Sequence, residues 1–589
     1  MKRKPAKSSV FANSESSGPF ADNLWSAEES SPAPPETEPI APPKNTESAL
    51  KQVIGTRDIM SNVFQHIASN LLSDSDEQMF TSRRSLFLAA QTCRAFVEPA
   101  LDSLWAVIPS LVPLLSLLPS LKRVNDKLVL GCVAPKDWEQ FDLHARRVRI
   151  ILMKKPHPAV SPYVYLRIPH HKTTDLLPGL KEVRIAHLDD YRIDLSGLFT
   201  ILTSNIRLVE LNKNAVQDGE FLGTFLSSVV VKIRQLHEII LRGDAAIENE
   251  INSIIQLKDL KTVELLLPNV FLSTAFLQGL GNFEDLRNLT LDTGKRPAVS
   301  LFGPSASTNA NYSSRRNVSG KGRRKESKYE EGLTPSSPSA SRTVAQPLFV
   351  NLRQLHLVGN LESLARTMKY MKLNSLTSFN IEERQDGQSQ WATSLWRHCF
   401  DVLSSTAAHS LKTIKITHSA DTYSSHRLSA SLIAPLLQIK NMESLEITTT
   451  TMSLDDAELQ QILGAFTNLK LLILPARCHD SSPTLRPLFR PLEICPALQE
   501  VSLCVGDTHN YADVEIPRGD GHQALRKLRI SSSFGSLTDT QVIRLARLFD
   551  RAFPNLEIIE GYGPQEYNES WKRVQEFRQA VQEIRRELE

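Results

Sequence analysis

A short apolar triplet recurs along most of this 589-residue chain. In each copy the second apolar residue follows the first by three positions and the third follows it by five, as in Leu180, Val183 and Ile185. Alternate residues of a strand point to opposite faces, so the last two residues of a triplet would share one face of a short strand. The chain must therefore contain an array of such strands. The first residues of the twelve copies are Leu180, Ile206, Leu236, Leu260, Leu286, Leu352, Leu376, Leu411, Met442, Leu469, Leu498 and Leu525.

The spacing of the triplet is that of leucine-rich repeats, L-x-x-L-x-L, which place one strand in each repeat. Between triplets the apolar residues change to helical spacing, as in residues 221–229. Capping boxes at Ser453 and Thr538, each followed three residues later by an acidic or amide side chain, mark expected helix starts. We therefore predict an α/β leucine-rich-repeat solenoid over residues 140–565, in which neighbouring repeats supply the burial that one repeat lacks.

One interval between triplets is much longer than the others. Leu286 and Leu352 are 66 residues apart, and residues 295–345 between them hold ten Lys or Arg against three Glu. Few large apolar groups are present to offset the entropy of ordering, so we predict a disordered basic insertion over residues 294–347. The same composition argument predicts a disordered tail over residues 1–47. The basic cluster within the insertion is compatible with a nuclear localisation signal, a nucleic-acid contact or a solvated loop.

The C-terminal segment alternates apolar and charged residues at helical spacing. The pattern predicts a helix over residues 566–589 whose apolar face covers the last repeat, because an open terminal repeat would leave apolar surface in water. A coiled coil is the alternative, although the segment spans only about two and a half heptads. The apolar residues are Trp571, Val574, Phe577, Val581, Ile584 and Leu588.

Residues 50–121 do not follow the repeat and predict three helices. Thr56 can cap the first, the second is expected from Ser82 to about Thr92, and the third can begin at Pro99 because proline suits a first helical turn. The 18 residues from 104 to 121 carry no charge, but three prolines argue against a membrane span. We expect this stretch to join the helices to the solenoid.

The runs Val63–Ile67, Arg84–Phe96 and Glu98–Trp105 resemble the F-box-like motif of fungal proteins that continue into irregular leucine-rich repeats. The resemblance implies that the helices bind the Skp adaptor of a cullin-RING (SCF) ubiquitin ligase and that the repeats hold the protein to be ubiquitinated. The family usually opens with a Leu-Pro pair, where this sequence has Ile54-Gly55-Thr56. The adaptor-facing residues implied by the resemblance are Ile59, Met60, Val63, Phe64, Ile67, Leu86 and Leu88. Packing within the three-helix core is the alternative for each of them.

In every triplet the residue between the last two apolar positions would point away from the core, to the open face of the sheet. Three of these twelve residues are basic and three acidic, so they lack the continuous positive stripe that a phosphate backbone requires. A protein substrate fits this surface better. The predicted substrate-binding residues are Arg184, Glu210, Ile240, Glu264, Thr290, His356, Asn380, Lys415, Glu446, Ile473, Ser502 and Arg529.

No motif in the sequence predicts catalysis, a cofactor or a metal site. Phosphate-binding loops and nucleophile elbows are absent, and the group of Cys478, His479, Cys495, Cys504 and His509 matches no common zinc spacing. The widely spaced cysteines and the N-terminus without an apolar signal segment predict reduced thiols in an intracellular protein, in the cytoplasm or the nucleus. We expect a non-catalytic substrate-recognition subunit. The alternatives are a repeat scaffold outside the ligase and, less favoured, a nucleic-acid-associated protein.

Overall fold

The computed structural model describes residues 56–73, 75–154, 160–186, 195–244, 246, 248–270, 272–294, 349–369, 371–384, 392–418, 427–448, 451–477, 482–489, 495–506, 524–532, 537–562 and 568–588. The chain divides into two compact units, Met1–Met60 and Ser61–Glu589. Helix α2 (Arg57–Ala68) begins in the first unit and continues into the second. The predicted tail and all but the first residue of the predicted insertion lie outside the described residues.

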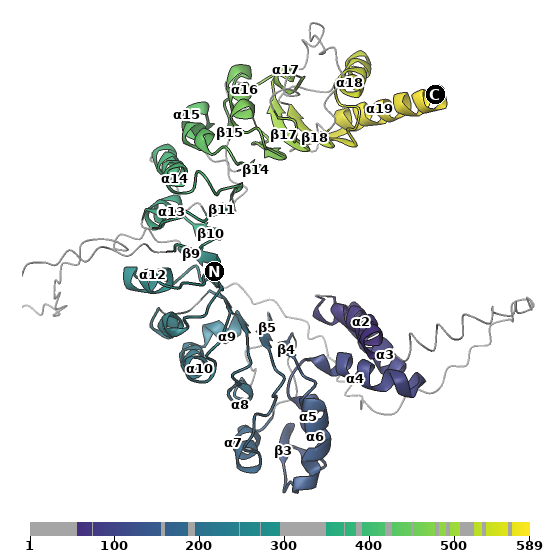
Figure 1. The fold of residues 1–589 in the computed structure, drawn as a ribbon, viewed down its shortest axis with the longest axis vertical. Coiled ribbons are helices and arrows are strands. Elements are labelled where there is room, and N and C mark those ends of the chain that lie inside the picture. Colours follow the sequence, from purple (N-terminus) through teal and green to yellow (C-terminus); the bar gives the residue numbers. More distant parts are fainter. Residues whose placement is uncertain are drawn as a thin grey trace, which may run out of the picture. The chain divides into compact units, whose positions relative to one another are not determined.

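In the described part of the chain, fifteen parallel strands form one continuous sheet in nearly sequential order (Figure 1). These strands are β1 (Val107–Ile108), β4 (Ile150–Met153), β5 (Glu182–Ile185), β6 (Leu208–Asn212), β7 (Glu238–Arg242), β8 (Thr262–Leu266), β9 (Asn288–Asp292), β10 (Gln354–Gly359), β11 (Ser378–Glu383), β12 (Thr413–His418), β14 (Ser444–Ile447), β16 (Leu471–Ile473), β17 (Glu500–Val505), β18 (Lys527–Ser532) and β19 (Ile558–Gly561). Two small sheets pair β2 (Leu121–Val124) with β3 (Lys127–Leu130) and β13 (Arg427–Leu428) with β15 (Thr451–Met452). The predicted α/β repeat solenoid is confirmed.

Each of the twelve predicted triplets coincides with one strand of this sheet. Strands β9 and β10 are direct neighbours, with Leu289 opposite Leu355, so the repeat continues across the long interval between them. The sequence analysis missed β4, although Val148, Ile151 and Met153 have the same spacing and are buried. This copy of the triplet was not recognised in the sequence because its first and last residues are valine and methionine.

Helices connect most of the strands and lie on one face of the sheet, as α10, α12, α13 and α14 do in Figure 1. The α-helices after the first strand are α5 (Val112–Leu115), α6 (Trp138–Ala145), α7 (Pro162–His171), α8 (Leu198–Ile201), α9 (Asn214–Gln217), α10 (Gly219–Lys232), α11 (Glu248–Ile251), α12 (Thr274–Gly281), α13 (Leu361–Met368), α14 (Ala392–Thr406), α15 (Ala430–Ile433), α16 (Asp456–Ala465), α17 (Arg486–Phe489), α18 (Asp539–Ala552) and α19 (Asn568–Leu588). Short 3-10 helices are η1 (Ser69–Leu72), η2 (Pro135–Asp137), η3 (Asn252–Gln256) and η4 (Ala434–Gln438). The core lies between the helices and the buried face of the sheet.

Side-chain caps fix where several helices begin. Thr538 caps α18 in the predicted box with Gln541. The prediction for Ser453 is wrong, because Asp455 caps α16 instead: its Oδ1 accepts the main-chain N–H of Glu458 at 2.8 Å, and Glu458 Oε2 accepts the N–H of Asp455 at 2.9 Å. Carboxylates can fill both positions of such a box, and the sequence pattern alone did not distinguish the two registers.

Before the solenoid, α2 is followed by α3 (Asp76–Thr92) and α4 (Arg94–Ala106). Helix α3 begins six residues before the expected Ser82, because Ser75 caps it and acidic residues follow in its first turn. Helix α4 begins at Arg94, which corrects the predicted start at Pro99. The extended residue Cys93 separates the two helices, and Pro99 lies inside α4, where it removes one main-chain hydrogen bond.

The last helix, α19, packs on α18 and β19, and its contacts with Asp550 of α18 extend to Gln582 and Arg585. Trp571 and Val574 are buried there, as predicted from the apolar spacing. Phe577 and Ile584 are 39% and 57% exposed, whereas the side chain of Arg578 is buried. The predicted apolar face is therefore only partly covered by the rest of the described chain.

Candidate protein-binding surfaces

The predicted substrate-binding residues form one row across the open face of the sheet. Strand register places each of them directly opposite the next, from Arg184 on β5 to Arg529 on β18. The row also includes Leu152 before Arg184 and Glu560 after Arg529, which the sequence analysis did not name. Parallel pairing without a shift in register keeps equivalent repeat positions side by side.

Two residues of this row do not offer an accessible surface. Ile473 is 9% exposed and Ser502 is 0% exposed, whereas the other ten predicted residues are half-buried. The sequence could place both residues on the open face. Which parts of that face are buried near β16 and β17 depends on tertiary contacts, which the repeat pattern does not show. We therefore remove Ile473 and Ser502 from the set that a partner can touch without rearrangement.

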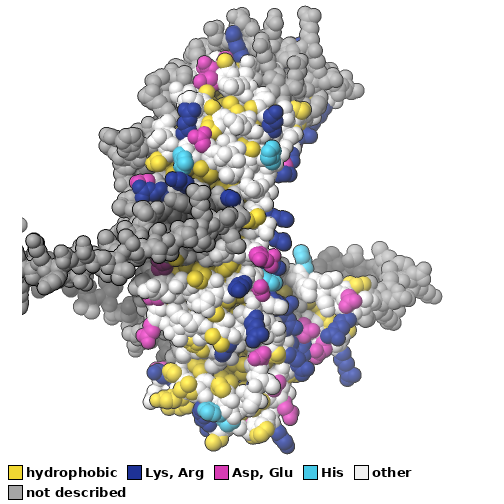
Figure 2. All heavy atoms as spheres, turned by 60° about the vertical axis from the view of Figure 1, so that its left-hand side comes forward, with side chains coloured by type: hydrophobic (Ala, Val, Ile, Leu, Met, Phe, Trp, Pro, Cys, Tyr) yellow, Lys and Arg dark blue, Asp and Glu magenta, His cyan; other side chains and the backbone are white. Residues whose placement is uncertain are grey.

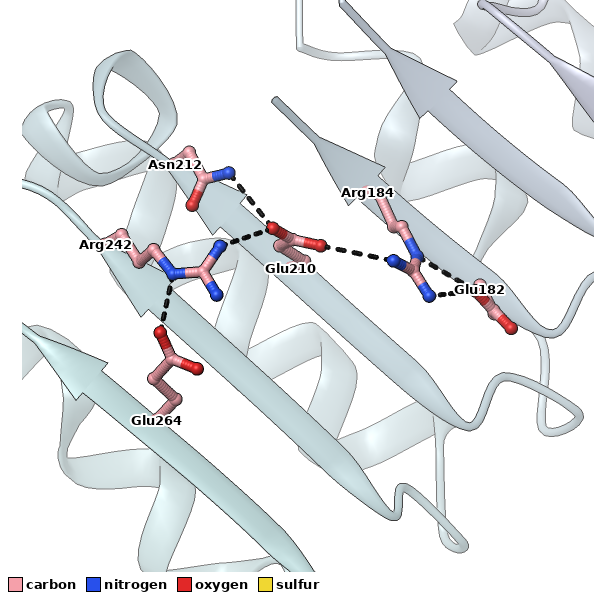
Figure 3. A network of polar contacts seen from close by, with 6 residues as sticks. All are labelled: Glu182, Arg184, Glu210, Asn212, Arg242 and Glu264. Atoms are coloured by element: carbon pink, nitrogen blue, oxygen red, sulfur yellow. Dashed lines mark hydrogen bonds and ion pairs between the residues drawn. The ribbon is translucent and has the colours of Figure 1, made fainter. Parts of the chain in front are cut away.

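Ion pairs connect the charged residues of β5 to β8 into a ladder across the strands (Figure 3). Arg242 lies between two carboxylates, with its Nη1 2.8 Å from Glu210 Oε1 and its Nε 2.6 Å from Glu264 Oε1. Arg184 pairs with Glu182 at 2.8 Å and lies 3.8 Å from Glu210. These hydrogen-bonded carboxylates raise the pKa of Arg242 against the opposing effect of its burial. Every charged residue of the ladder therefore has an oppositely charged partner, although its three carboxylates outnumber its two arginines.

Charges at the other end of the row are compensated in the same way. Lys415 Nζ lies 2.9 Å from Glu446 Oε1. Arg529 pairs with Glu500 at 3.0 Å and with Glu560 at 2.6 Å. Hydrogen bonds from cationic side chains, Arg529 among them, lower the pKa of Glu560 although its partial burial acts in the opposite direction. All six charged residues among the predicted twelve thus have an oppositely charged neighbour within the chain.

The helix-covered face shows no extended area of one charge. In Figure 2, Lys and Arg side chains and Asp and Glu side chains are both scattered over the described part of this face. Phosphate backbones are bound by clustered positive charge. The basic insertion that motivated the nucleic-acid alternative lies outside the described residues.

The structure separates the predicted adaptor-facing residues into exposed and buried ones. Val63 on α2 is 47% exposed and Leu88 on α3 is 49% exposed. Phe64 and Leu86 are buried, and the ring of Phe64 packs edge to face on Phe96 of α4 with centroids 5.5 Å apart. Ile67 is half-buried. Phe64 and Leu86 lie in the core of the helical unit formed by α2, α3 and α4, which is the alternative that the sequence analysis kept open for each of these residues.

The two predicted residues at the start of α2 also differ. Ile59 is 43% exposed, and Met60 is 6% exposed. Met60 is therefore buried and does not offer a surface to a partner, whereas Ile59 does. Helical periodicity placed both on one apolar face, and it could not say which part of that face the fold covers.

Helix α3 carries exposed aromatic residues that the sequence analysis did not assign to a surface. Phe80 is 67% and Phe87 is 52% exposed. They lie two turns apart on one side of α3, away from the buried Ser82 and Leu86. The late start expected for this helix left Phe80 outside it; the signal that marks the true start is Ser75 followed by two acidic residues.

A buried arginine joins the helical unit to the first strands of the sheet. The side chain of Arg147 is 6% exposed, and its Nη2 lies 2.7 Å from Glu98 Oε2 on α4. The same guanidinium pairs with Asp102, one turn further along α4. Arg83 on α3 donates from Nη2 to the carbonyl oxygen of Val107 in β1 at 2.9 Å. We call Glu98, Asp102 and Arg147 the joint, because they fix α4 against the residues that precede β4.

Among the described residues, no three or more His, Cys, Asp or Glu side chains are arranged to hold a metal ion. Likewise no helix within the described ranges is long and apolar enough to cross a membrane. Cys93, Cys132 and Cys399 are free thiols, but Cys504 is disulfide-bonded, which corrects the expectation of reduced thiols throughout. Burial raises the pKa of Cys495 to about 11, so this thiol is not a nucleophile near neutral pH.

Comparison with known proteins does not place the chain in a family. No protein-family model matches the sequence. No curated protein matches it either. Among solved structures, a chain in the crystal structure of the Rad7 and Elc1 complex in yeast aligns with 12% identity and a TM-score of 0.29, covering 82% of this chain and 95% of that one. A likeness of this size carries no argument about function.

Proposed function

We propose that the protein is a substrate-recognition subunit of an SCF ubiquitin ligase, whose helical unit binds a Skp adaptor and whose repeat sheet binds a protein substrate. The observation that carries the proposal is the set of exposed apolar side chains on α2 and α3, in a unit that precedes a repeat sheet. Val63, Phe80, Phe87 and Leu88 are each between 47% and 67% exposed. Solvent contact with large apolar groups is unfavourable, and a partner that buries them gains their transfer free energy.

The F-box-like resemblance supports the Skp adaptor as that partner, through which a cullin would join the complex. The motif runs quoted above coincide with α2, α3 and α4. Phe64 and Phe96, both within those runs, form the aromatic contact that holds α2 on α4. The motif thus supplies both the core of the helical unit and, through Val63 and Leu88, part of its exposed surface.

The joint supports a role in positioning. A subunit of a ligase must hold its substrate at a fixed place relative to the adaptor, and a flexible connection would dilute that effect. Arg147 and Arg83 instead tie α4 and α3 to the start of the sheet. We propose that the chain contributes this geometry and no bond chemistry of its own, and that it acts inside the cell, in the cytoplasm or the nucleus.

The test is retention of purified Skp adaptor on the immobilised full-length chain. Val63→Asp combined with Phe87→Asp places two carboxylates in the surface that the adaptor would bury. Desolvating an unpaired charge is costly, so we expect adaptor retention to fall by at least about 100-fold. Both positions are exposed, which leaves folding intact, and circular dichroism checks this.

The matched control makes the same change at exposed apolar residues elsewhere. Tyr163 and Leu166 on α7 are 73% and 65% exposed and do not belong to the helical unit. Tyr163→Asp with Leu166→Asp should retain the adaptor as the wild type does. If the wild-type chain fails to retain any adaptor, the ligase proposal is wrong and a repeat scaffold outside the ligase becomes the better description.

A further inference from the structure

On three consecutive strands in the middle of the open face, two rows hold only neutral polar side chains, where the strands on both sides carry charges. We call these residues the neutral section. Each strand contributes two of them, and register places them in two rows of three. The next row along these strands holds Glu382 of β11, which lies 3.8 Å from Arg384. The neutral section consists of Asn288 and Thr290 on β9, Gln354 and His356 on β10, and Ser378 and Asn380 on β11.

The charges that flank the neutral section are already compensated within the chain. On one side the ladder ends at Glu264 on β8, which pairs with Arg242 at 2.6 Å. On the other side Lys415 on β12 pairs with Glu446 at 2.9 Å. The nearest charge on the same three strands, Glu382, lies 3.8 Å from Arg384, which also pairs with Asp292. A ligand that lies on the neutral section therefore meets only charges that already have an opposite partner, and a charged ligand would lose hydration there without gaining a free counter-ion.

Part of the hydrogen-bonding capacity of the neutral section is unused. His356 Nε2 and Asn380 Oδ1 make no hydrogen bond to any described residue. Asn288 does have a partner, since its Nδ2 donates to Thr262 Oγ1 at 3.2 Å. Burial lowers the pKa of His356, so its imidazole is neutral at pH 7 and offers one donor and one acceptor. Gln354 is exposed and adds an amide at the surface.

Buried polar atoms without partners are unfavourable, because they have lost their hydrogen bonds to water without gaining any within the protein. Two of them side by side, on His356 and Asn380, on a surface of otherwise neutral polar groups favour a ligand that brings donors and acceptors but no charge. Main-chain amides and the side chains of Ser, Thr, Asn and Gln have this chemistry.

We propose that the neutral section binds an uncharged, polar, extended segment of the substrate protein through hydrogen bonds. The inference rests on the proposed function, because it names the class of segment that the repeat sheet would present to the ligase. Its affinity depends on groups in β9 to β11 and is nearly independent of salt, since no ion pair forms.

The experiment selects random 12-residue peptides, displayed on phage, on the immobilised full-length chain. Enriched peptides are then synthesised with capped ends and a fluorophore, and their Kd is measured by anisotropy in 50 and 500 mM NaCl. The variant His356→Ala with Asn380→Ala removes two groups of the neutral section, and Gln354→Ala removes an exposed one if the double variant fails to fold. Arg242→Gln is the control in the neighbouring ladder.

The proposal expects enriched peptides poor in Asp, Glu, Lys and Arg, with a Kd that changes less than about twofold between the two salt concentrations. His356→Ala with Asn380→Ala should raise the Kd at least about tenfold, which is the loss of one good hydrogen bond, and Arg242→Gln should leave it within about twofold. Enrichment of charged peptides, equal binding by the neutral-section variants, or no enrichment at all would each overturn it. Failure of the proposed function is seen separately, in the adaptor assay, which uses no peptide.

Discussion

Arg147 and Glu98 lie 49 positions apart in the sequence, and their side chains meet with Nη2 2.7 Å from Oε2. The guanidinium is buried and the carboxylate is 60% exposed. This pair and the neighbouring Asp102 connect α4 to Arg147, which precedes β4 by three positions. A long-range contact of this kind decides whether the helical unit and the sheet behave as one body.

Replacing Arg147 should loosen this connection. We expect Arg147→Met to lower the free energy of unfolding by about 2 kcal/mol, because hydrogen bonds to charged groups are lost while the apolar stem is kept. Urea denaturation measures the change, and limited proteolysis between α4 and β4 should become faster. Arg123→Met is the matched control, since Arg123 pairs with Asp126 at 3.2 Å but both are largely exposed. Equal effects of the two substitutions would contradict a structural role for the joint.

Glu383 should make stability depend on pH. It is 4% exposed, and burial raises its pKa from 4.5 to about 7. The folded state then binds a proton more tightly than the unfolded state, so the free energy of unfolding is highest below pH 4.5 for this group and falls as pH rises towards 7. Glu383→Gln should therefore stabilise the protein at pH 8, by up to about 3 kcal/mol, and have little effect at pH 4.

Thermal unfolding of the Glu383→Gln variant between pH 4 and pH 8 checks this sign. Glu382→Gln is the control, because Glu382 is the preceding residue on β11 but is half-buried and faces the open side. If Glu383→Gln is no more stable than the wild type at pH 8, the fold must stabilise the ionised carboxylate of Glu383, which would contradict the prediction.

Gln575 should protect the last edge of the sheet. Its Oε1 accepts the main-chain N–H of Ile559 at 3.1 Å, and its Nε2 donates to the carbonyl oxygen of Glu557 at 2.7 Å. The side-chain amide thus makes the bonds that another strand would make, and unpaired strand edges promote association. We expect Gln575→Ala to lose about 1–2 kcal/mol of stability and to form oligomers at high concentration, as measured by light scattering. Gln579 is exposed and lies one turn further along α19, so Gln579→Ala should have the stability and the oligomeric state of the wild type.

Arg242 should contribute little to the free energy of unfolding, and its contribution should be larger at low salt than at high salt. Its side chain is 41% exposed, so solvent screens both ion pairs of the ladder in Figure 3. Arg242→Met is expected to cost less than about 1 kcal/mol in 50 mM NaCl and less still in 500 mM NaCl. Arg234→Met, at an exposed arginine outside the ladder, gives the baseline. A large, salt-independent loss with Arg242→Met would mean that the ladder holds the sheet together.

Sequence alone was sufficient for the repeat architecture. The triplet places two apolar residues on one face of each strand, and this local rule holds at Leu180 as at Leu525 because it depends only on the two-residue period of a strand. It also fixed the register, and with it the row from Arg184 to Arg529 on the open face. Strand pairing across the long interval followed, because only triplets can continue the buried surface.

Tertiary structure decided which of these residues are available. The sequence grouped Val63 with Phe64 and Leu86 with Leu88, and the fold buries one member of each pair while it exposes the other. Helical periodicity marks an apolar face, but burial depends on what packs on that face. The compensation of charges along the row was likewise beyond the sequence, because it requires the distances between side chains on strands that are 22 or more residues apart, such as Arg242 and Glu264.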